Sequence, residues 1–245
     1  MRTVVFIPAR MGSSRFPGKP LAPIAGRPLI ERVCRQALKA RGVDQVVVAT
    51  DEPRIAEAVR SFGGQAIMTD PAHACGSDRV AQAARLLNLE PDDIAVNLQG
   101  DQPLCPPRII EDAVRPLRAD PALGLATVAV RLDPKEAADP AKVKVVCDAQ
   151  GFALYFSRAV IPHARDRGIN PPLLKHLGVY AFRVWSLEKF SRLQPGVLEE
   201  IEKLEQLRAL EHGLPIKVEL AGTDSPAVDQ PQDVAFIEAL LAEGD

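Results

Sequence analysis

The amino-acid sequence predicts an α/β fold: a three-layer α/β/α arrangement around a mostly parallel mixed sheet. Two observations predict it. Up to about residue 98, short apolar runs alternate with amphipathic helical patterns, as expected of parallel strands joined by crossover helices. After about residue 120, strand patterns follow one another with little helix between them, which predicts a β-rich segment. The chain has 245 residues, 47% of them hydrophobic, and can therefore bury a substantial core.

The first elements follow from the spacing of apolar residues and from the residues that start and stop helices. Strands are predicted at residues 3–9, 45–50, 66–69 and 94–98. A helix is expected to begin at Pro28, because proline suits the first helical position. A second helix is expected through residues 55–62, ending at Gly63-Gly64. Ser77 is expected to cap a third.

Most of the later elements are expected to be strands. The strand patterns cover residues 125–132, 142–148, 152–157, 176–183 and 216–220. A hairpin turn is expected at residues 148–151, which read Asp-Ala-Gln-Gly. Helical patterns return at residues 198–212 and 231–241. We interpret residues 1–245 as a single domain that carries a β-rich subdomain at roughly 131–185.

Composition and charge exclude several classes of protein. The formal net charge of −2 argues against a dedicated nucleic-acid binder, which needs a concentrated basic surface. No uncharged run approaches the roughly 20 residues of a membrane-spanning helix, and the N-terminus lacks the pattern of a signal peptide. The four cysteines are scattered and form no C-x-x-C pair, as in a reducing compartment. We therefore expect a cytoplasmic protein without membrane insertion.

A basic, glycine-containing loop follows the first predicted strand. Its cations are Arg10, Arg15 and Lys19, separated by small residues. Cations and accessible backbone amides together suit a polyphosphate. The loop is not a Walker loop, because Gly18-Lys19 is followed by proline rather than by serine or threonine. The alternative is an ordinary solvated basic loop.

Two aspartates stand where further strands are expected to end. Asp101 follows Gly100 after the fourth predicted strand, and Asp229 lies between the last strand and the last helix. Each has a plain structural alternative: Asp101 in a turn before Pro103, and Asp229 as the cap of the last helix. Because ligands bind at the carboxyl ends of strands in open α/β sheets, both can also be metal ligands. Together with the loop they indicate metal-dependent phosphoryl or nucleotidyl transfer.

The same segments belong to a longer series of motifs. The loop reads Pro8-Ala9-Arg10-x-x-Ser13-Ser14-Arg15-x-Pro17-Gly18-Lys19-Pro20-Leu21. Later motifs are Val48-Ala49-Thr50-Asp51, Gln99-Gly100-Asp101, Ala153-Leu154-Tyr155-Phe156-Ser157-Arg158, His176-Leu177-Gly178-Val179-Tyr180, Leu204-Glu205-Gln206-Leu207-Arg208 and Val228-Asp229-x-Pro231. In this order they resemble the 3-deoxy-manno-octulosonate (KDO) cytidylyltransferases, or CMP-KDO synthetases. The loop alone resembles the wider group of nucleotide-sugar transferases, and the later motifs make the resemblance specific.

The resemblance implies a fold and a reaction. The family has a nucleotide-diphospho-sugar transferase-like, Rossmann-like fold and forms homodimers through the β-rich segment. Its members use Mg²⁺ to transfer CMP from CTP to the anomeric hydroxyl of KDO. The reaction releases pyrophosphate and gives CMP-KDO for lipopolysaccharide biosynthesis. Direct in-line attack on the α-phosphorus is expected, because no Ser–His–Asp or Cys–His constellation indicates a covalent enzyme intermediate.

Carried over residue by residue, the resemblance also implies roles. Nucleotide-binding residues are expected to be Pro8, Ala9, Arg10, Ser14, Arg15, Lys19, Gly76, Ser77 and Arg79. Sugar-binding residues are expected to be Gln99, Arg158, His176, Tyr180, Glu205 and Gln206, with Arg158 suited to bidentate binding of the sugar carboxylate. Catalytic residues are expected to be Arg10, Lys19, Asp101 and Asp229. The two aspartates are expected to hold two Mg²⁺ ions, one for the triphosphate and one for the sugar.

Local sequence alone gives plainer readings for several of these residues. Tyr180 fits a core strand, Glu205 and Gln206 fit a solvated helix face, and His176 fits a structural histidine. The resemblance does not extend to three other histidines, which we interpret as structural or surface residues: His73, His163 and His212.

The sequence departs from the family pattern at two positions. Cys75 stands where the family has serine near the expected cytosine pocket, and Gln102 stands where many members have glutamate. The second change bears on the sugar, because part of the family prefers the 8-amino analogue of KDO. Three alternatives stay open: the same reaction on 8-amino-KDO, a CMP-sialate synthetase-like enzyme, and a catalytically silent nucleotide-binding protein.

Overall fold

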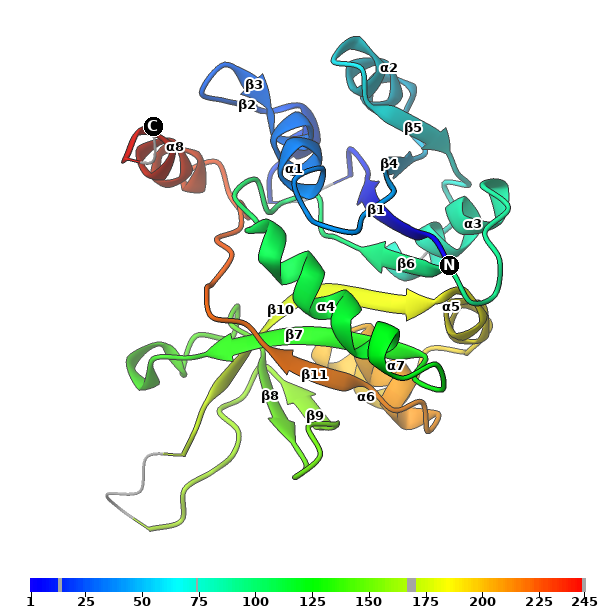
Figure 1. The fold of residues 1–245 in the computed structure, drawn as a ribbon. Helices are drawn as coiled ribbons and strands as arrows, with labels where there is room; N and C mark the ends of the chain where they lie inside the picture. The colour runs from blue at the N-terminus through cyan, green and yellow to red at the C-terminus, as the bar shows by residue number, and fades with distance from the viewer. Residues whose placement is uncertain (13–14, 74, 167–170, 244–245) are drawn as a thin grey trace.

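One mixed sheet runs through the molecule and carries the site at its edge (Figure 1). The structure is a computed structural model that describes residues 1–12, 15–73, 75–166 and 171–243. The strand order is β11-β7-β10-β6-β1-β4-β5, and β10 alone runs antiparallel to its neighbours in this series. These strands are β1 (Thr3–Ala9), β4 (Gln45–Thr50), β5 (Gln65–Met68), β6 (Ile94–Asn97), β7 (Leu125–Arg131), β10 (Leu174–Arg183) and β11 (Lys217–Leu220).

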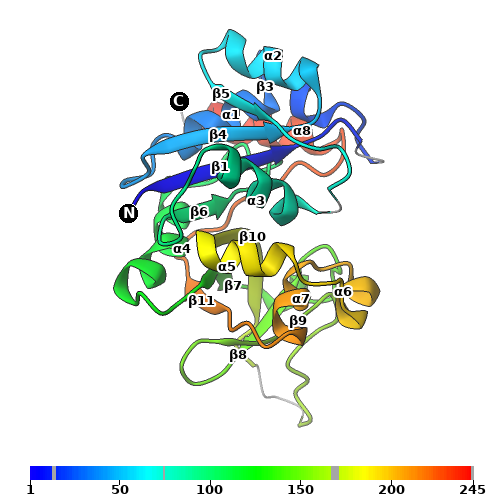
Figure 2. The ribbon, with the colours of Figure 1, turned by 90° about the vertical axis from the view of Figure 1, so that its right-hand side faces the viewer.

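Helices cover both faces of the sheet. On β1, Val5 and Ile7 face one core, and Val4 and Phe6 face the other, because successive side chains of a strand point to opposite sides. The first core is closed by α1 (Leu29–Ala37), α2 (Pro53–Ser61) and α4 (Pro107–Ala119). The second is closed by α3 (Gly76–Leu86), α5 (Val184–Ser191) and α7 (Gln206–Glu211), and Figure 2 shows α3 and α5 in front of the sheet. The three-layer prediction is confirmed.

A hairpin of β8 (Lys144–Cys147) and β9 (Ala153–Ser157) extends from β10 at one end of the molecule (Figure 1). The predicted turn at residues 148–151 is confirmed. The amide of Gly151 donates to the carbonyl of Asp148 over 3.1 Å, and Gly151 has φ +79°, which glycine adopts without strain. Strand β10 itself crosses the central sheet, so the β-rich segment and the α/β core share it.

The remaining elements are short connections and the C-terminal helix. They are η1 (Lys19–Leu21), β2 (Pro23–Ile24), β3 (Arg27–Pro28), η2 (Pro134–Glu136), α6 (Val197–Glu202) and α8 (Asp233–Glu243). Helix α8 packs Ile237 against Ile24 and Leu29. None of the described helices is both long and apolar enough to cross a lipid bilayer.

Several expected helix boundaries were wrong. Pro28 precedes α1 rather than opening it, and Ser77 lies inside α3, whose flanking residue is Cys75. Asp229 does not cap the last helix, which begins four residues later at Asp233. The Asp233 carboxylate instead accepts hydrogen bonds from the amides of Asp229 and Gln230, at 2.7 and 2.8 Å. Helices α4 and α5 were not predicted.

The predicted helix at residues 198–212 is broken into α6 and α7. Lys203 has φ +54° and ends α6 in the left-handed region. Arg158 binds the carbonyl oxygens that the break releases: its Nε donates to Glu202 over 2.8 Å and its Nη2 to Lys203 over 3.4 Å. A guanidinium thus satisfies acceptors that a continuous helix would have used internally. The break directs residues 204–206 toward the sheet.

Candidate active site

Three adjoining hollows lie at the carboxyl ends of β1 and β6. The first is bordered by Pro8, Ala9, Arg10, His73, Cys75, Gly76, Arg79 and Gln99. The second shares Pro8, Ala9, Arg10 and Gln99 with it and adds Gly12, Arg15, Lys19, Pro20, Gly100 and Asp101. The third lies beside β10, and Gln99, Gln102, Lys142, Lys175, His176, Tyr180 and Asp229 are among its lining residues. Gln99 borders all three, so they form one continuous site.

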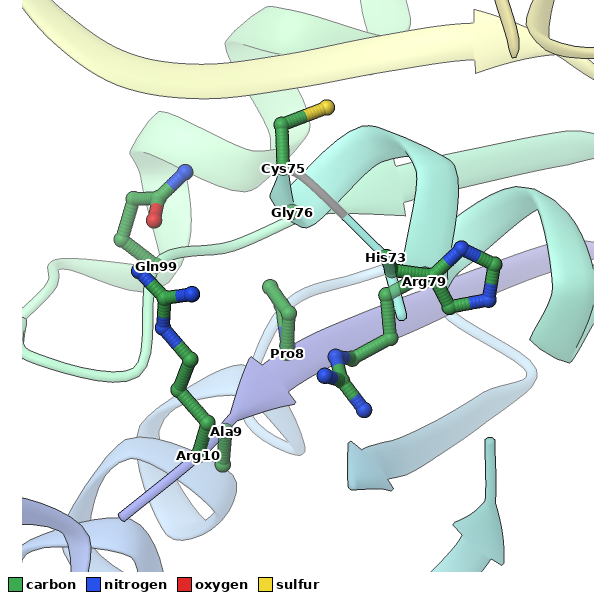
Figure 3. Close-up of a pocket in the computed structure, with 8 residues that line it drawn as sticks. All are labelled: Pro8, Ala9, Arg10, His73, Cys75, Gly76, Arg79 and Gln99. Atoms are coloured by element: carbon green, nitrogen blue, oxygen red, sulfur yellow. The ribbon is translucent and has the colours of Figure 1, made fainter. Parts of the chain in front are cut away.

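The first hollow lies between the end of β1 and the start of α3 (Figure 3). In Figure 3, Arg10 and Gln99 lie on one side of Pro8 and Arg79 on the other. Arg79 is only 4% exposed, and its Nη1 donates to Thr69 Oγ1 over 2.6 Å and lies 3.2 Å from Asp51 Oδ1. A guanidinium held in this way is fixed in position before any ligand binds.

Gly76 leaves room in the first hollow. A Cβ atom at this position would lie 3.4 Å from Pro8 Cγ, in van der Waals contact with the wall of the hollow. Gly76 is also the first residue of α3, where backbone N–H groups have no partner within the helix. The absence of a side chain therefore leaves these amides accessible to a ligand, and such amides favour an anion.

Ser77 and Glu205 bind each other instead of bordering the expected hollows. The Ser77 hydroxyl is buried, donates to Glu205 Oε1 over 3.0 Å and accepts a hydrogen bond from Asn97 Nδ2 over 3.1 Å. Burial raises the pKa of the Glu205 carboxyl, while hydrogen bonds from Cys75 and Ser77 oppose the rise. In the described chain the Ser77 hydroxyl has its partners within the protein, and Glu205 cross-links α3 to α7.

Lys19 brings the two expected aspartates together in the second hollow. Its Nζ lies 3.0 Å from Asp101 Oδ2 and 3.9 Å from Asp229 Oδ1, and donates to the Val228 carbonyl over 2.9 Å. Arg15 Nη2 lies 3.4 Å from the same Asp229 oxygen. The amide of Val228 donates to the Asp101 carbonyl over 2.8 Å, which holds the two segments side by side. Ser14, the remaining expected contact of this loop, lies outside the described residues.

This pair of carboxylates fits a Mg²⁺ ion. Mg²⁺ prefers oxygen ligands and is usually held by one or two carboxylates together with substrate phosphates. Asp101 and Asp229 converge on one ammonium group, so both can reach a cation that takes its place. Among the residues that the structure describes, no group of three or more His, Cys, Asp or Glu side chains forms a closed metal site. The aspartates therefore fit a metal that arrives with a phosphate ligand.

His176 and Tyr180 line the third hollow, as expected from the sequence. The Thr127 hydroxyl donates to the Val179 carbonyl over 2.7 Å, so its 2.8 Å bond to His176 Nε2 must use the imidazole proton. Burial lowers the pKa of His176 to about 3, and the ring is neutral. This leaves Nδ1 as a hydrogen-bond acceptor. The Tyr180 hydroxyl donates to Gln206 Oε1 over 2.8 Å.

Arg158 is not brought to the third hollow. Besides its bonds to Glu202 and Lys203, its Nη1 donates to the Pro140 carbonyl over 2.9 Å. Carbonyl oxygens thus surround the guanidinium in this arrangement, and the expected clamp on a sugar carboxylate stays a prediction. Glu205 and Gln206 also lie behind the described lining of this hollow, and Gln206 is buried at 3% exposure.

Several lining residues with polar or charged side chains were not predicted as site residues. Among them are His73 in the first hollow and Gln102, Lys142 and Lys175 in the third. His73 pairs through Nε2 with Gln82 Oε1 over 2.7 Å. The sequence signal that could have identified His73 is its position three residues before Gly76, an expected nucleotide-binding residue. Lys142 pairs with Glu136 and Lys175 with Asp224, and neither lysine is part of a recognisable motif.

Comparisons with known proteins agree with this geometry. Residues 4–218 match the family model described as cytidylyltransferase. A 3-deoxy-manno-octulosonate cytidylyltransferase of Desulfosudis oleivorans is 53% identical over 243 residues, which cover 99% of this chain and 98% of the relative. An 8-amino-3,8-dideoxy-manno-octulosonate cytidylyltransferase of Shewanella woodyi is 50% identical over 244 residues and 99% of each chain.

A solved structure is similar over the full length. It is a CMP:2-keto-3-deoxy-manno-octonic acid synthetase complexed with CTP, with a TM-score of 0.94 and 42% identity, and the match covers 100% of both chains. Family model, relatives and structure thus agree from end to end. The chain belongs to the 3-deoxy-manno-octulosonate cytidylyltransferase (CMP-KDO synthetase) family of nucleotidyltransferases.

Proposed function

We propose that this protein transfers CMP from CTP to the anomeric hydroxyl of KDO or of 8-amino-KDO and releases pyrophosphate. One observation carries the proposal: Lys19 joins Asp101 and Asp229 at the centre of a continuous site. A hollow with two arginines lies on one side, and a hollow lined by hydrogen-bonding and charged side chains, among them His176, Lys142 and Lys175, lies on the other. Such a site suits a phosphate donor and a polyhydroxylated acceptor that meet at a metal.

The nucleotide would occupy the first and second hollows. Gly76 and the backbone around Pro8 and Ala9 leave room for the nucleoside, and Arg79 is held beside it. Arg10, Arg15 and Lys19 would bind the phosphates. Fixed cations at this place lower the barrier, because they stabilise the charge that develops on the departing pyrophosphate.

Asp101 and Asp229 would hold Mg²⁺, with one ion for the triphosphate and a second for the sugar. When bound, Mg²⁺ supplies Lewis-acid stabilisation of the phosphoryl group and lowers the pKa of a coordinated hydroxyl. The protein's own part is to orient the two substrates. The sugar oxygen then forms a bond to the α-phosphorus in line with the bond that breaks to the β-phosphate.

The sugar would lie in the third hollow. The bare Nδ1 of His176 can accept a hydrogen bond from a sugar hydroxyl, and Gln99 and Tyr180 add further polar contacts. Lys142 and Lys175 are the cations beside this hollow and can attract the sugar carboxylate. Arg158, Glu205 and Gln206 would act by positioning this wall rather than by direct contact.

An apolar hollow on the β8–β9 hairpin supports a homodimer. Val145, Val146, Leu154 and Tyr155 contribute to it, and Leu154 is 62% exposed. A contiguous apolar patch of this kind marks an interaction surface in soluble proteins. We include in the proposal a homodimer joined here, a cytoplasmic location and a role in lipopolysaccharide synthesis.

The test is pyrophosphate release with CTP and Mg²⁺, comparing KDO, 8-amino-KDO and sialic acid at equal concentration. Release with KDO or the amino sugar supports the proposal, and the ratio of kcat/KM values identifies the preferred substrate. Release with sialic acid alone would favour a CMP-sialate synthetase. Release from none of them, with CTP still bound, would favour a silent nucleotide-binding protein, and full activity in excess EDTA would contradict the role of Mg²⁺.

A further inference from the structure

A groove between α1 and α8 lies apart from the three hollows described above. It encloses about 670 Å³, a volume within the range of small-molecule sites in proteins. One wall is formed by α1, the other by the end of α8, and Pro103 and Leu104 complete the lining. Figures 1 and 2 place α1 and α8 at the end of the molecule opposite to β8 and β9. The groove therefore lies far from the hairpin that we propose as the dimer interface.

The wall formed by α1 is basic. Arg32, Arg35 and Lys39 line the groove at a spacing of three and four residues, so they follow one stripe of the helix. Arg27, from β3, adds a fourth cation, and no carboxylate is among the lining side chains that the structure describes. Arg35 is paired with Glu31 over 2.8 Å, whereas Arg27 and Lys39 form no ion pair within the described part of the chain. A chain with a formal net charge of −2 thus concentrates positive charge along this wall.

The opposite wall is apolar. Leu240 and Leu241 line the groove from α8, and Leu104 lines it from the segment that follows β6. All three leucines are half-buried, so they line the groove rather than project from the surface. Leu38 of α1 also borders the groove and is 65% exposed. Because this apolar surface is open to water, an apolar ligand that covers it would bind favourably.

The protein itself holds the two walls in place. Ile237 of α8 packs against Ile24, and Glu238 of α8 accepts a hydrogen bond from the amide of Ala25 over 2.6 Å. Arg32 of α1 binds the same connection, because its Nε donates to the Ile24 carbonyl over 2.7 Å and its Nη2 to the Ala25 carbonyl over 3.0 Å. Residues 24–25 thus join α1 to α8. A groove that is formed in advance costs little ordering when a ligand binds.

We propose that this groove binds an amphipathic anion: a single acyl chain that carries a carboxylate or phosphate head group. The basic stripe of α1 binds the head group, and the leucines of the opposite wall cover the chain. The groove suits one chain better than the surface of a bilayer, because docking on a bilayer requires several projecting apolar side chains. Among the lining leucines that the structure describes, Leu38 alone is exposed. The inference goes beyond the function proposed above and does not depend on it.

Calorimetric titration of the whole chain with decanoate, below its micellar concentration, tests the proposal. Acetate carries the head group alone and decanol the chain alone, so each should bind at least about tenfold more weakly than decanoate. The double variant Arg35→Glu, Lys39→Glu should weaken decanoate binding by about tenfold or more, because it places like charge beside the head group. Leu240→Asn should weaken it by about tenfold through lost apolar contact. The matched control is Arg54→Glu, Arg60→Glu, the same change of charge at exposed positions of α2.

Amide hydrogen exchange identifies where the ligand binds. Decanoate should slow exchange in α1 and α8, whose residues line the groove, and leave β8 and β9 unchanged. If the double variant fails to fold, Lys39→Ala removes one exposed cation and should weaken binding by about threefold to tenfold.

Several results would overturn the proposal. They are no binding of decanoate, equal binding of acetate or decanol, unchanged binding by the groove variants, and protection confined to the β8–β9 hairpin. Binding to vesicles of anionic phospholipid without binding of decanoate would replace the acyl anion with a bilayer surface. A wild-type chain that binds decanoate in the groove but releases no pyrophosphate would overturn the proposed function and leave this inference standing.

Discussion

Ser77 at the start of α3 and Glu205 at the start of α7 share a hydrogen bond of 3.0 Å, although 128 positions separate them in the chain. The contact is reinforced by Arg208, which lies 3.4 Å from Asp78 and is paired with Glu199. Helix α3 carries Gly76 and Arg79 into the first hollow, and residue 204 before α7 borders the third. The bond therefore joins the walls of the two substrate regions.

Glu205→Gln should reduce the dependence of stability on pH. Burial raises the pKa of Glu205 above its ordinary 4.5 in the folded chain, so the folded state holds this proton more tightly than the unfolded state. The contribution of the protonated Glu205 carboxyl to the free energy of unfolding is complete below pH 4.5. It is lost as the pH rises through the pKa that Glu205 has in the folded chain. The Tm of Glu205→Gln minus that of wild type should therefore increase from acid to pH 8. Glu200→Gln, at an exposed position of α6, is the control; equal pH slopes in both variants would contradict the prediction.

Asp101→Asn should abolish turnover without unfolding the protein. The change removes a charge that binds Lys19 and that would bind Mg²⁺, and the Asp101 side chain is partly exposed, so its loss creates no cavity. We expect kcat to fall by about a thousandfold or more, because metal stabilisation contributes several kcal/mol. Pyrophosphate release measures the rate, and thermal unfolding should change little. The exposed Asp92→Asn should keep its activity. Near-normal turnover by Asp101→Asn would rule out its role as a metal ligand.

The fold could be predicted where local pattern decides it. Strand β1 was predicted to the residue, because its apolar run is bounded on both sides by polar or charged residues. Helix α4 was missed, because prolines at positions 106, 107 and 116 are typical of a connecting segment. In the structure Pro106 precedes the helix and Pro107 opens it, where proline is tolerated, and Pro116 lies inside the helix. The break at Lys203 could not be predicted, since Arg158 stabilises it from 45 positions away.

The candidate site could likewise be predicted from the sequence only in part. Lys19, Asp101 and Asp229 were predicted to be neighbours because they follow elements that end at one edge of the sheet, and in the structure each aspartate has an oxygen within 4 Å of Lys19 Nζ. A motif identifies a residue type but not the direction of its side chain. Arg158 and Glu205 were therefore expected at the sugar, while their side chains are held by other parts of the protein.

His176 should remain neutral in the Nε2–H form down to about pH 4. Burial lowers its pKa to about 3, and Thr127 accepts the Nε2 proton. The pKa of His176 is lower in the folded chain than in the unfolded chain. The neutral ring therefore contributes to the stability of the fold above pH 6.5, and this contribution is lost as the pH falls toward 3. The ¹⁵N shifts of the imidazole, assigned by their absence in His176→Asn, measure the tautomer. A doubly protonated ring at pH 5 would contradict the arrangement.

Arg158 provides a test that separates positioning from direct contact. Its guanidinium binds carbonyl oxygens of Pro140, Glu202 and Lys203, so Arg158→Ala should destabilise the fold by about 2 kcal/mol through the loss of these hydrogen bonds. The sugar KM should rise together with the loss of stability, because Leu204 and the neighbours of Pro140, Asp139 and Ala141, border the third hollow. Arg158→Lys should be intermediate, since an ammonium group keeps the charge but cannot span three carbonyls in a plane. Lys189→Ala, on α5, is the control for loss of a cation. A variant as stable as wild type that had lost only its affinity for the sugar would instead show that Arg158 turns to bind the substrate directly.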